Sequence, residues 1–436
     1  MPHPTPVMKI IATPILLPIV FAFAFISCYA QTKGKTKKCF IVSDIHFDPL
    51  FGVHSDTLMY KNLQKTSIED WKKLFESSAA QLTVNTTLLG KDANYGILKS
   101  ALTNMKKRLP NPEFIVIAGD FIWHGAKPKD SILKRKTIRF IAQLFKENFP
   151  DVTIIPAMGN NDTYGNDYEL QDARFLNDFA DAWSPVLPKA AAAELKSQGY
   201  YTVKKDNLKF IVINGASLAY GSQYLEQADA QLNWLQSVLA NPDNKNVWII
   251  SHIPVGLNGY NNKNMWNVDN TQTYINSVVA NAAKVKFGIA SHTHLNEFKV
   301  FYDNTRKAVA YMRVVPSICS NHYNNPSFEI AEFNNNTGEV VGETNYYLNL
   351  SAIPKDKSVD APDWNDTFSI PSFFQMGKLN ADSFSKLISD IKANSSGLML
   401  KNYVKFYNVG ATPDSAKTMN RSNYMNYLKA DSLKAN

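Results

Sequence analysis

The chain has 436 residues, of which 45% are hydrophobic, 12% are aromatic and 19% are charged. This composition supplies enough apolar side chains for a large packed core and excludes wholesale disorder. The formal net charge is +8, but the lysines and arginines form no long block, so nucleic-acid binding has no support in the sequence.

The first thirty residues differ in kind from the rest of the chain. An apolar run over residues 10–26 is followed by small residues that end at Ala30, the order typical of a secretory signal peptide. We therefore predict a signal peptide over 1–30, a linker over 31–37 and a secreted or periplasmic protein. The alternatives are a membrane anchor, which two prolines in the run disfavour, and lipidation at Cys28.

Strands and helices alternate over the middle of the chain. Apolar runs that end in polar residues predict strands at 39–46, 113–120, 152–160, 247–252 and 285–292. Helical spacing of apolar residues predicts helices at 95–108, 134–148 and 228–240. A long connection precedes the first of these helices, and an irregular segment follows residue 160. A hairpin over 199–214 turns at Lys205-Asp-Asn207. The alternation predicts an α/β fold with a mostly buried sheet.

The pattern changes toward the C-terminus. Residues 308–341 read as strands and turns, which predicts antiparallel strands that close the domain. Asn380 is placed to cap a helix, and 422–434 also has a helical pattern. We therefore predict one domain over 38–350 and a C-terminal helical subdomain over 351–436.

Polar side chains stand at the ends of the predicted strands, where open α/β sheets place their ligands. Residues two apart on a strand point the same way, so Asp44 and His46 can share one ion, and His292 and His294 can serve two neighbouring ions. Imidazole and carboxylate groups suit zinc, manganese or iron. The complete set, in chain order, is Asp44, His46, Asp120, Asn160, His252, His292 and His294.

Two such cations about 3.5–4 Å apart clamp a phosphoryl group and generate a hydroxide nucleophile at neutral pH. They require a carboxylate that bridges them, and Asp120, directly after Gly119, is the natural candidate. A single histidine at the end of a strand is usually structural. The whole ordered set is hard to explain without a metal site, so the sequence predicts two bound divalent ions.

The ordered set resembles the calcineurin-like metallophosphoesterase superfamily and, more narrowly, the acid sphingomyelinase-like phosphodiesterases. The resemblance covers roughly residues 38–350. It implies a metallophosphoesterase-type β-sandwich flanked by helices. It is carried by the motifs Ser43-Asp-Ile-His-Phe-Asp-Pro49, Gly119-Asp-Phe-Ile-Trp-His124, Ser251-His-Ile-Pro254 and Ser291-His-Thr-His-Leu-Asn-Glu-Phe-Lys-Val-Phe-Tyr-Asp303.

The resemblance also implies how the ligands divide and that the metal is zinc. One ion would be held by Asp44, His46, Asp120 and His294. The other would be held by Asp120, Asn160, His252 and His292. A hydroxide bridging the ions would attack phosphorus in line with the leaving oxygen. His124 would bind the phosphate and protonate the leaving group.

The sequence departs from the superfamily pattern at Asn161, in Gly159-Asn-Asn-Asp162, where a histidine is usual. An amide can hydrogen-bond a phosphate oxygen but cannot donate a proton as imidazolium does. We therefore expect Asn161 to bind substrate in the catalytic site, with more of the acid catalysis falling to His124. The same variant is similar to endopolyphosphatase-like proteins, which brings phosphoanhydride substrates into consideration.

Three functions follow, in order of preference. The first is an exported phosphodiesterase of the sphingomyelinase-like kind. The second is a polyphosphate or nucleotide phosphoanhydride hydrolase on the same fold, and the third is a non-catalytic exported binding protein. In the family that the sequence resembles, acid sphingomyelinase carries a cysteine-rich saposin domain, which the residues between Ala30 and Lys38 could not form. Membrane contact is therefore possible but unsupported, and no protein partner is evident. Cys39 and Cys319 are too far apart in sequence for spacing to show whether they pair.

Overall fold

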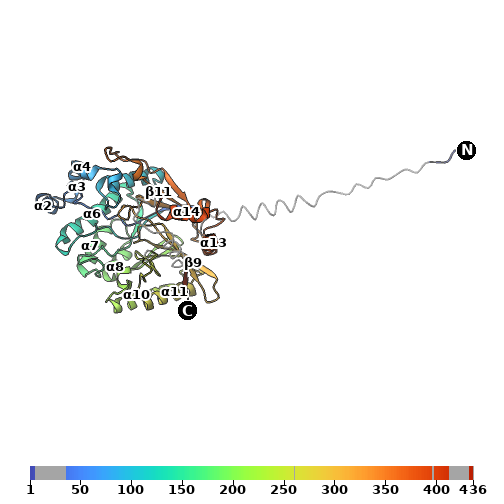
Figure 1. The fold of residues 1–436 in the computed structure, drawn as a ribbon. Helices are drawn as coiled ribbons and strands as arrows, with labels where there is room; N and C mark the ends of the chain where they lie inside the picture. Colours follow the sequence, from blue (N-terminus) through green and yellow to red (C-terminus); the bar gives the residue numbers. More distant parts are fainter. Residues whose placement is uncertain (5–35, 260, 395–396, 412–431, 436) are drawn as a thin grey trace.

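The computed structural model describes residues 1–4, 36–259, 261–394, 397–411 and 432–435. Two mixed β-sheets pack together, with helices around them (Figure 1), so the predicted α/β sandwich flanked by helices is confirmed. The predicted signal peptide, Cys28 and most of the linker lie in 5–35, outside the described residues. Within the described part of the chain, no helix is long and apolar enough to cross a membrane.

The first sheet has six strands in the order β12-β11-β10-β1-β2-β3. Its strands β1, β2 and β3 run parallel, whereas β10 runs antiparallel to β1, β11 to β10 and β12 to β11. The carboxyl ends of the three parallel strands therefore share one edge. The bounds are β1 Thr36–Val42, β2 Phe114–Ile117, β3 Thr153–Pro156, β10 Ser327–Asn334, β11 Val340–Tyr347 and β12 Asp366–Ser369.

The second sheet has seven strands in the order β13-β8-β9-β7-β6-β5-β4. Its central strands β5, β6, β7 and β9 are parallel. The predicted hairpin is confirmed as β4 and β5, which turn at Asp206 with a φ of 51°. The bounds are β4 Tyr201–Lys205, β5 Leu208–Val212, β6 Val247–Ile250, β7 Val285–Ala290, β8 Glu297–Tyr302, β9 Ala308–Val314 and β13 Ser432–Lys434.

Aromatic rings join the two sheets in the core. Phe114 of the first sheet lies 4.8 Å from Phe210 and 5.6 Å from Trp248 of the second, measured between ring centroids. Trp248 also meets Phe333 of the first sheet at 5.4 Å. These edge-to-face contacts between fully buried rings are favourable beyond the area that they bury, and they set how the sheets stack.

Helices cover both sheets. Helices α5 (Tyr95–Arg108), α6 (Ser131–Asn148) and α7 (Ala173–Trp183) belong to the large apolar cluster around the first sheet. Helices α10 (Leu225–Ala240) and α11 (Val268–Ala280) pack on the second sheet in a separate cluster, at the bottom of Figure 1. The bounds predicted for α5 are confirmed, and α6 and α10 begin earlier than predicted.

The sequence patterns did not predict several of the helices. The long connection before α5 holds α2 (Thr57–Lys65), α3 (Ile68–Glu76) and α4 (Ala79–Leu82). Reading the stretch after residue 160 as irregular is wrong, because it contains α7 and α8 (Lys189–Gln198). The signal for α7 was present, since Phe175, Phe179 and Trp183 recur every four residues and are buried. Shorter helices are α9 (Gly215–Leu218) and the 3₁₀ segments Thr86–Leu88, Pro128–Asp130 and Leu350–Ala352.

The C-terminal segment contains the helix predicted after Asn380 but also extends both sheets. Its helices are α12 (Ile370–Phe373), α13 (Ala381–Ala393) and α14 (Leu398–Tyr407), and the Asn380 side chain caps α13 as predicted, by accepting from the Ser383 N–H. Strand β12 pairs with β11, and β13 pairs with β8. The helix predicted over 422–434 is therefore wrong at 432–434, and its remainder lies outside the described residues. A domain boundary at 350 stays a prediction.

A buried ion network also ties the sheets together. Arg313 on β9 donates from Nη2 to Glu329 Oε1 of β10 at 2.9 Å and from Nε to Glu343 Oε2 of β11 at 2.8 Å. All three side chains are buried. Burial raises the pKa of Glu329 to about 7 although the charge of Arg313 acts in the opposite direction. The guanidinium therefore compensates two carboxylates that have little access to water.

We expect Arg313→Leu to destabilise the fold by about 3–5 kcal/mol, because it leaves two buried carboxylates uncompensated. Urea unfolding followed by circular dichroism measures this loss. The matched control is Arg306→Leu in the exposed β8–β9 turn, which should change stability by less than about 0.5 kcal/mol. Equal stability of the two variants would contradict the role of the network.

Candidate metal centre

The structure brings all seven sequence-predicted ligands together at one edge of the sandwich. Each follows the carboxyl end of a parallel strand: β1, β2 and β3 in one sheet, and β6 and β7 in the other. Six of the seven side chains are buried, and His292 is half-buried. The complete set is Asp44, His46, Asp120, Asn160, His252, His292 and His294.

One part of this set surrounds Asp44. Its Oδ1 lies 3.5 Å from His294 Nε2 and 3.8 Å from His46 Nε2. His46 Nε2 in turn lies 3.4 Å from Asp120 Oδ2. Ligand atoms of Asp44, His46 and Asp120 all lie within 4.8 Å of one another, close enough to hold one ion.

The other part surrounds His252. Its Nε2 lies 3.1 Å from Asp120 Oδ2, 3.0 Å from Asn160 Oδ1 and 3.3 Å from His292 Nδ1. Asp120, His252 and His292 again form a group whose ligand atoms lie within 4.8 Å of one another. Asp120 belongs to both parts, which is the position that a bridging carboxylate requires.

The backbone at these residues is strained in a consistent way. Asp44, His46, Asp120, His292 and His294 have φ values of 45°, 41°, 57°, 74° and 64°. Residues with a Cβ rarely adopt this left-handed region, and such strain collects at functional sites. Five of the seven proposed ligands thus combine a left-handed backbone with a side chain that lies at the common centre.

Two glycines make room for the shared carboxylate. Gly119 has a φ of 100°, and a Cβ there would lie 2.7 Å from His252 Nδ1. A Cβ at Gly159 would lie 2.0 Å from Asp120 Oδ1, far inside van der Waals contact. The Gly-Asp and Gly-Asn steps of the sequence motif are therefore steric requirements of the site.

Asp162 was not predicted as a site residue, yet it joins the loops after β2 and β3. Its buried carboxylate accepts from the backbone N–H groups of Asp120 at 2.9 Å, Phe121 at 2.9 Å and Gly159 at 2.8 Å. Burial, with the nearby charge of Asp120, raises the pKa of Asp162 to about 7. Its place directly after Asn161 in the motif was the available signal.

Burial dominates the electrostatics of the site. It raises the pKa of Asp44 to about 7 and lowers that of His46 to about 4 and that of His292 to about 3. These imidazoles are therefore neutral and have a lone pair for a metal. Burial opposes the ionised forms of Asp120 and His252 as well, but their mutual attraction outweighs it, lowering the pKa of Asp120 and raising that of His252 to about 9.

Two orphaned atoms show that the residues fit a cation. Among the described residues, Asp44 Oδ1 and His46 Nε2 are buried and have no hydrogen-bond partner. Buried polar atoms are nearly always paired, because leaving them unpaired costs free energy. A divalent ion would satisfy both, and the donor set of carboxylates, imidazoles and one amide suits such an ion.

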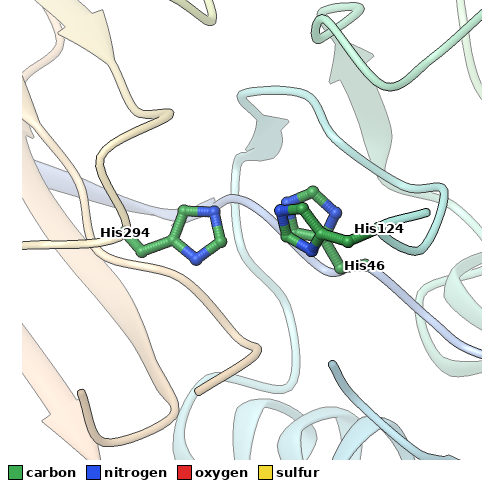
Figure 2. Close-up of side chains that lie close together, drawn as sticks. All are labelled: His46, His124 and His294. Atoms are coloured by element: carbon green, nitrogen blue, oxygen red, sulfur yellow. The ribbon is translucent and has the colours of Figure 1, made fainter. Parts of the chain in front are cut away.

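His124 lies beside the first group of ligands. Its ring stacks on that of His46 with centroids 3.8 Å apart, and His294 faces the pair from the opposite loop (Figure 2). Asp92, which was not predicted, lies 2.6 Å from His124 Nδ1 through Oδ1. Burial lowers the pKa of His124, but the hydrogen bond and charge of Asp92 outweigh it and raise the pKa. No local pattern signals Asp92, because only the fold brings it to His124.

A cavity of ≈ 510 Å³ opens onto the centre. Asn161 lines it, with Nδ2 donating to Asp120 Oδ2 at 3.1 Å and the N–H to Asp120 Oδ1 at 2.9 Å, and its role in binding substrate stays a prediction. The amide is thus tied to the shared carboxylate. Tyr168, His322 and Tyr407 also line the cavity and were not predicted. Tyr407 comes from α14, so the C-terminal segment helps to form the site.

Cys39 and Cys319, the cysteines among the described residues, are buried and do not pair with each other. Cys39 lies in β1, and its thiol donates to the Ala331 carbonyl at 3.7 Å. Cys319 lies beside the metal centre instead, with Sγ 3.4 Å from His294 Nδ1. The sequence left open whether these two cysteines pair, and in the structure each thiol is free and has a different partner.

Comparison with known families matches residues 37–296 to the model described as calcineurin-like phosphoesterase. The chain belongs to the calcineurin-like phosphoesterase family. The predicted superfamily, and with it a phosphoric ester hydrolase that uses metal, is confirmed at the level of the family. The ordered ligands that suggested it are the ones that the fold gathers at one edge.

Curated relatives place this phosphoesterase beside sphingomyelinase-like enzymes. It is 25% identical to acid sphingomyelinase-like phosphodiesterase 3b of Mus musculus, over 87% of this chain and 85% of the relative. It is also 25% identical to the cyclic GMP-AMP phosphodiesterase SMPDL3A of Homo sapiens, over 84% and 81% of the two chains. Among solved structures, that of PhoD matches with a TM-score of 0.43 and 11% identity, over 85% and 78%.

We expect Gly159→Ala to lower metal content and activity sharply, because the added methyl group collides with the Asp120 carboxylate. Overpacking of this kind also destabilises folded proteins by about 1–3 kcal/mol. Metal analysis by mass spectrometry and urea unfolding measure the two effects. The control is Gly377→Ala, where an added Cβ meets no atom within 4 Å. Normal metal content in Gly159→Ala would refute this steric account.

Proposed function

We propose that this phosphoesterase is an exported phosphodiesterase that acts through two divalent metal ions, with zinc expected. The observation that carries the proposal is the placement of Asp120 between two sets of ligands, with its Oδ2 3.4 Å from His46 Nε2 and 3.1 Å from His252 Nε2. The names of the relatives, a sphingomyelinase-like phosphodiesterase and a cyclic GMP-AMP phosphodiesterase, support a phosphodiester substrate.

The proposed division of the ligands follows the distances. Asp44, His46, Asp120 and His294 would hold one ion, and Asp120, Asn160, His252 and His292 would hold the other. Bound there, the ions would supply positive charge for the phosphoryl oxygens and a water of lowered pKa. The protein's part is to orient the ligands through the strained strand ends and to exclude most of the solvent by burying them.

His124 is proposed to bind a phosphate oxygen and to protonate the leaving group. Asp92 Oδ1 holds Nδ1 of the ring, which leaves Nε2 for the substrate. Stacking on His46 keeps the imidazole next to the ligands of the first ion. The amide of Asn161 donates a hydrogen bond to Asp120 and is not acidic enough to transfer a proton, so no second general acid lies at that position.

Replacement of the shared carboxylate tests the centre. Asp120→Ala should abolish hydrolysis of bis(p-nitrophenyl) phosphate and reduce bound metal to less than one ion per chain. The release of nitrophenolate and metal analysis of the purified protein give the two readouts. Asp151→Ala, on the exposed surface before β3, is the control and should behave like the wild type. Full activity in Asp120→Ala would contradict the proposed metal centre.

The dependence of the hydrolysis rate on the leaving group tests the proposed role of His124 as a proton donor. His124→Gln should slow diesters with poor, alkoxide leaving groups by roughly 10²–10⁴-fold, the usual contribution of a general acid, and spare p-nitrophenyl esters. Metal content should not change, because the side chain at this position lies outside the proposed ligand set. An equal loss of kcat for good and poor leaving groups would show that His124 only binds the substrate.

Phosphoanhydride hydrolysis is the second candidate, motivated by Asn161. Rates with sphingomyelin, a nucleoside triphosphate and polyphosphate, measured under one metal condition, separate the two functions. The soluble diester bis(p-nitrophenyl) phosphate, added to this panel, should be hydrolysed fastest, since polar side chains such as Asn161, Asn258 and Asn321 line the cavity that opens onto the centre. A clear preference for sphingomyelin would exclude the second candidate.

Export is proposed from the apolar run over 10–26 and the small residues that precede Gln31. Cleavage there would give a mature protein that starts at Gln31. Mass spectrometry of the protein recovered from the periplasm or the medium tests this. An intact N-terminus would contradict cleavage.

A further inference from the structure

The histidines of the centre each present one ring nitrogen to the ligand group and the other to the protein. His46 Nδ1 and His252 Nδ1 meet backbone carbonyls, those of Ile122 and Ala118, both at 2.8 Å. Partners of this kind fix the tautomer and the ring orientation of a metal ligand. A backbone carbonyl leaves these two rings with little freedom.

The ring of His292 is held differently. Its Nδ1 faces His252 and the ligand group, while its Nε2 meets the hydroxyl of Tyr168 at 3.0 Å. When the Nε2–H donates to the phenol oxygen, the lone pair of Nδ1 is left for a metal. Tyr168 is a side chain at the rim of the cavity, 42% exposed, and it has a left-handed φ of 64°.

The residue before Tyr168 holds a second ligand of the same group. Asp167 Oδ1 accepts from Asn160 Nδ2 at 2.7 Å, which directs Asn160 Oδ1 toward His252 Nε2. An amide has distinct donor and acceptor ends, so this hydrogen bond decides which end faces the metal position. The Tyr168 N–H also donates to the Asn160 carbonyl at 3.1 Å.

The segment that carries both side chains is ordered by its own contacts. Asn166 donates from Nδ2 to Glu169 Oε1 at 2.6 Å, and the Glu169 N–H donates to the Asn166 carbonyl at 3.0 Å. The buried Lys134 of α6 donates to the carbonyls of Thr163 and Gly165 at 2.9 Å and 2.8 Å. Asp167 and Tyr168 are therefore presented by an anchored turn.

We propose that Asp167 and Tyr168 are positioning residues that set the affinity of one of the two metal sites, the one formed by Asn160, His252 and His292 with Asp120. The inference rests on the proposed dinuclear centre and assigns to these two residues a role within it. Within the described part of the chain, their hydrogen bonds to the proposed ligands reach Asn160 and His292, and none reaches Asp44, His46 or His294. Loss of either residue should therefore weaken one ion selectively.

Metal release from the zinc-loaded, full-length protein into a competing chelator tests this selectivity. Tyr168→Phe and Asp167→Ala should each weaken one of the two ions by about 10–100-fold, the usual cost of losing the hydrogen-bond partner of a ligand. The other ion should stay at its wild-type affinity. Asp167→Asn keeps a carbonyl oxygen that can accept from Asn160 and should restore most of the lost affinity.

Tyr164→Phe is the matched control. It removes a hydroxyl of the same segment, whose hydrogen bond goes to Asp178 Oδ2 at 2.8 Å, away from every proposed ligand. Both ions should keep their wild-type affinity in this variant, and thermal melting checks that all variants fold.

The outcomes separate this inference from the proposed function. Wild-type protein that binds fewer than two ions would overturn the dinuclear centre itself. Two ions in the wild type, with unchanged affinities in both Tyr168→Phe and Asp167→Ala, would overturn the positioning role alone. Equal weakening of both ions in these variants would also overturn it, because the segment would then support the whole site.

Discussion

The structure depends on one constraint, which is that a single buried carboxylate must face ligands from two different sheets. Asp120 follows a strand of the first sheet, and His252 follows a strand of the second, yet their side chains lie 3.1 Å apart. The carboxyl ends of parallel strands in both sheets must therefore meet at one edge. Buried aromatic contacts of Phe114, Trp248 and Phe333 join the two sheets in the core and so support that alignment.

The loops after β2 and β3 approach each other closely, and this restricts which residues can occupy them. Because Gly159 has no side chain, it leaves space for the Asp120 carboxylate, and a Cβ at this position would collide with it. Asp162 gathers the N–H groups of both loops onto one carboxylate, so the donors at these strand ends are satisfied without water. The left-handed backbone at the ligands is stable only because these surrounding contacts over-determine it.

The site is asymmetric in the side chains that lie beside its two groups of proposed ligands. His124, backed by Asp92, stands beside the ligands of one proposed ion, while Asn161, tied to Asp120, stands at the position where the family usually has a histidine. The turn that carries Asp167 and Tyr168 lies on the side of Asn160 and His292. Hydrogen-bond support is thus divided between the two groups of proposed ligands, with the proposed proton donor beside one group and the proposed positioning residues beside the other.

The sequence by itself located the proposed ligands at the ends of their strands, because an apolar run that ends in polar residues reports both a buried strand and the point where it ends. It also determined the cap at Asn380 and the helix at 95–108, which are local effects. Only the tertiary structure decided the pairing of β12 and β13 with the two sheets, the contact of Asp92 with His124, and the place of Tyr168 beside His292. The two side-chain contacts join residues that are 32 and 124 positions apart. Contacts between residues so far apart depend on how the sheets stack, and no local pattern of side chains in the sequence indicates that stacking.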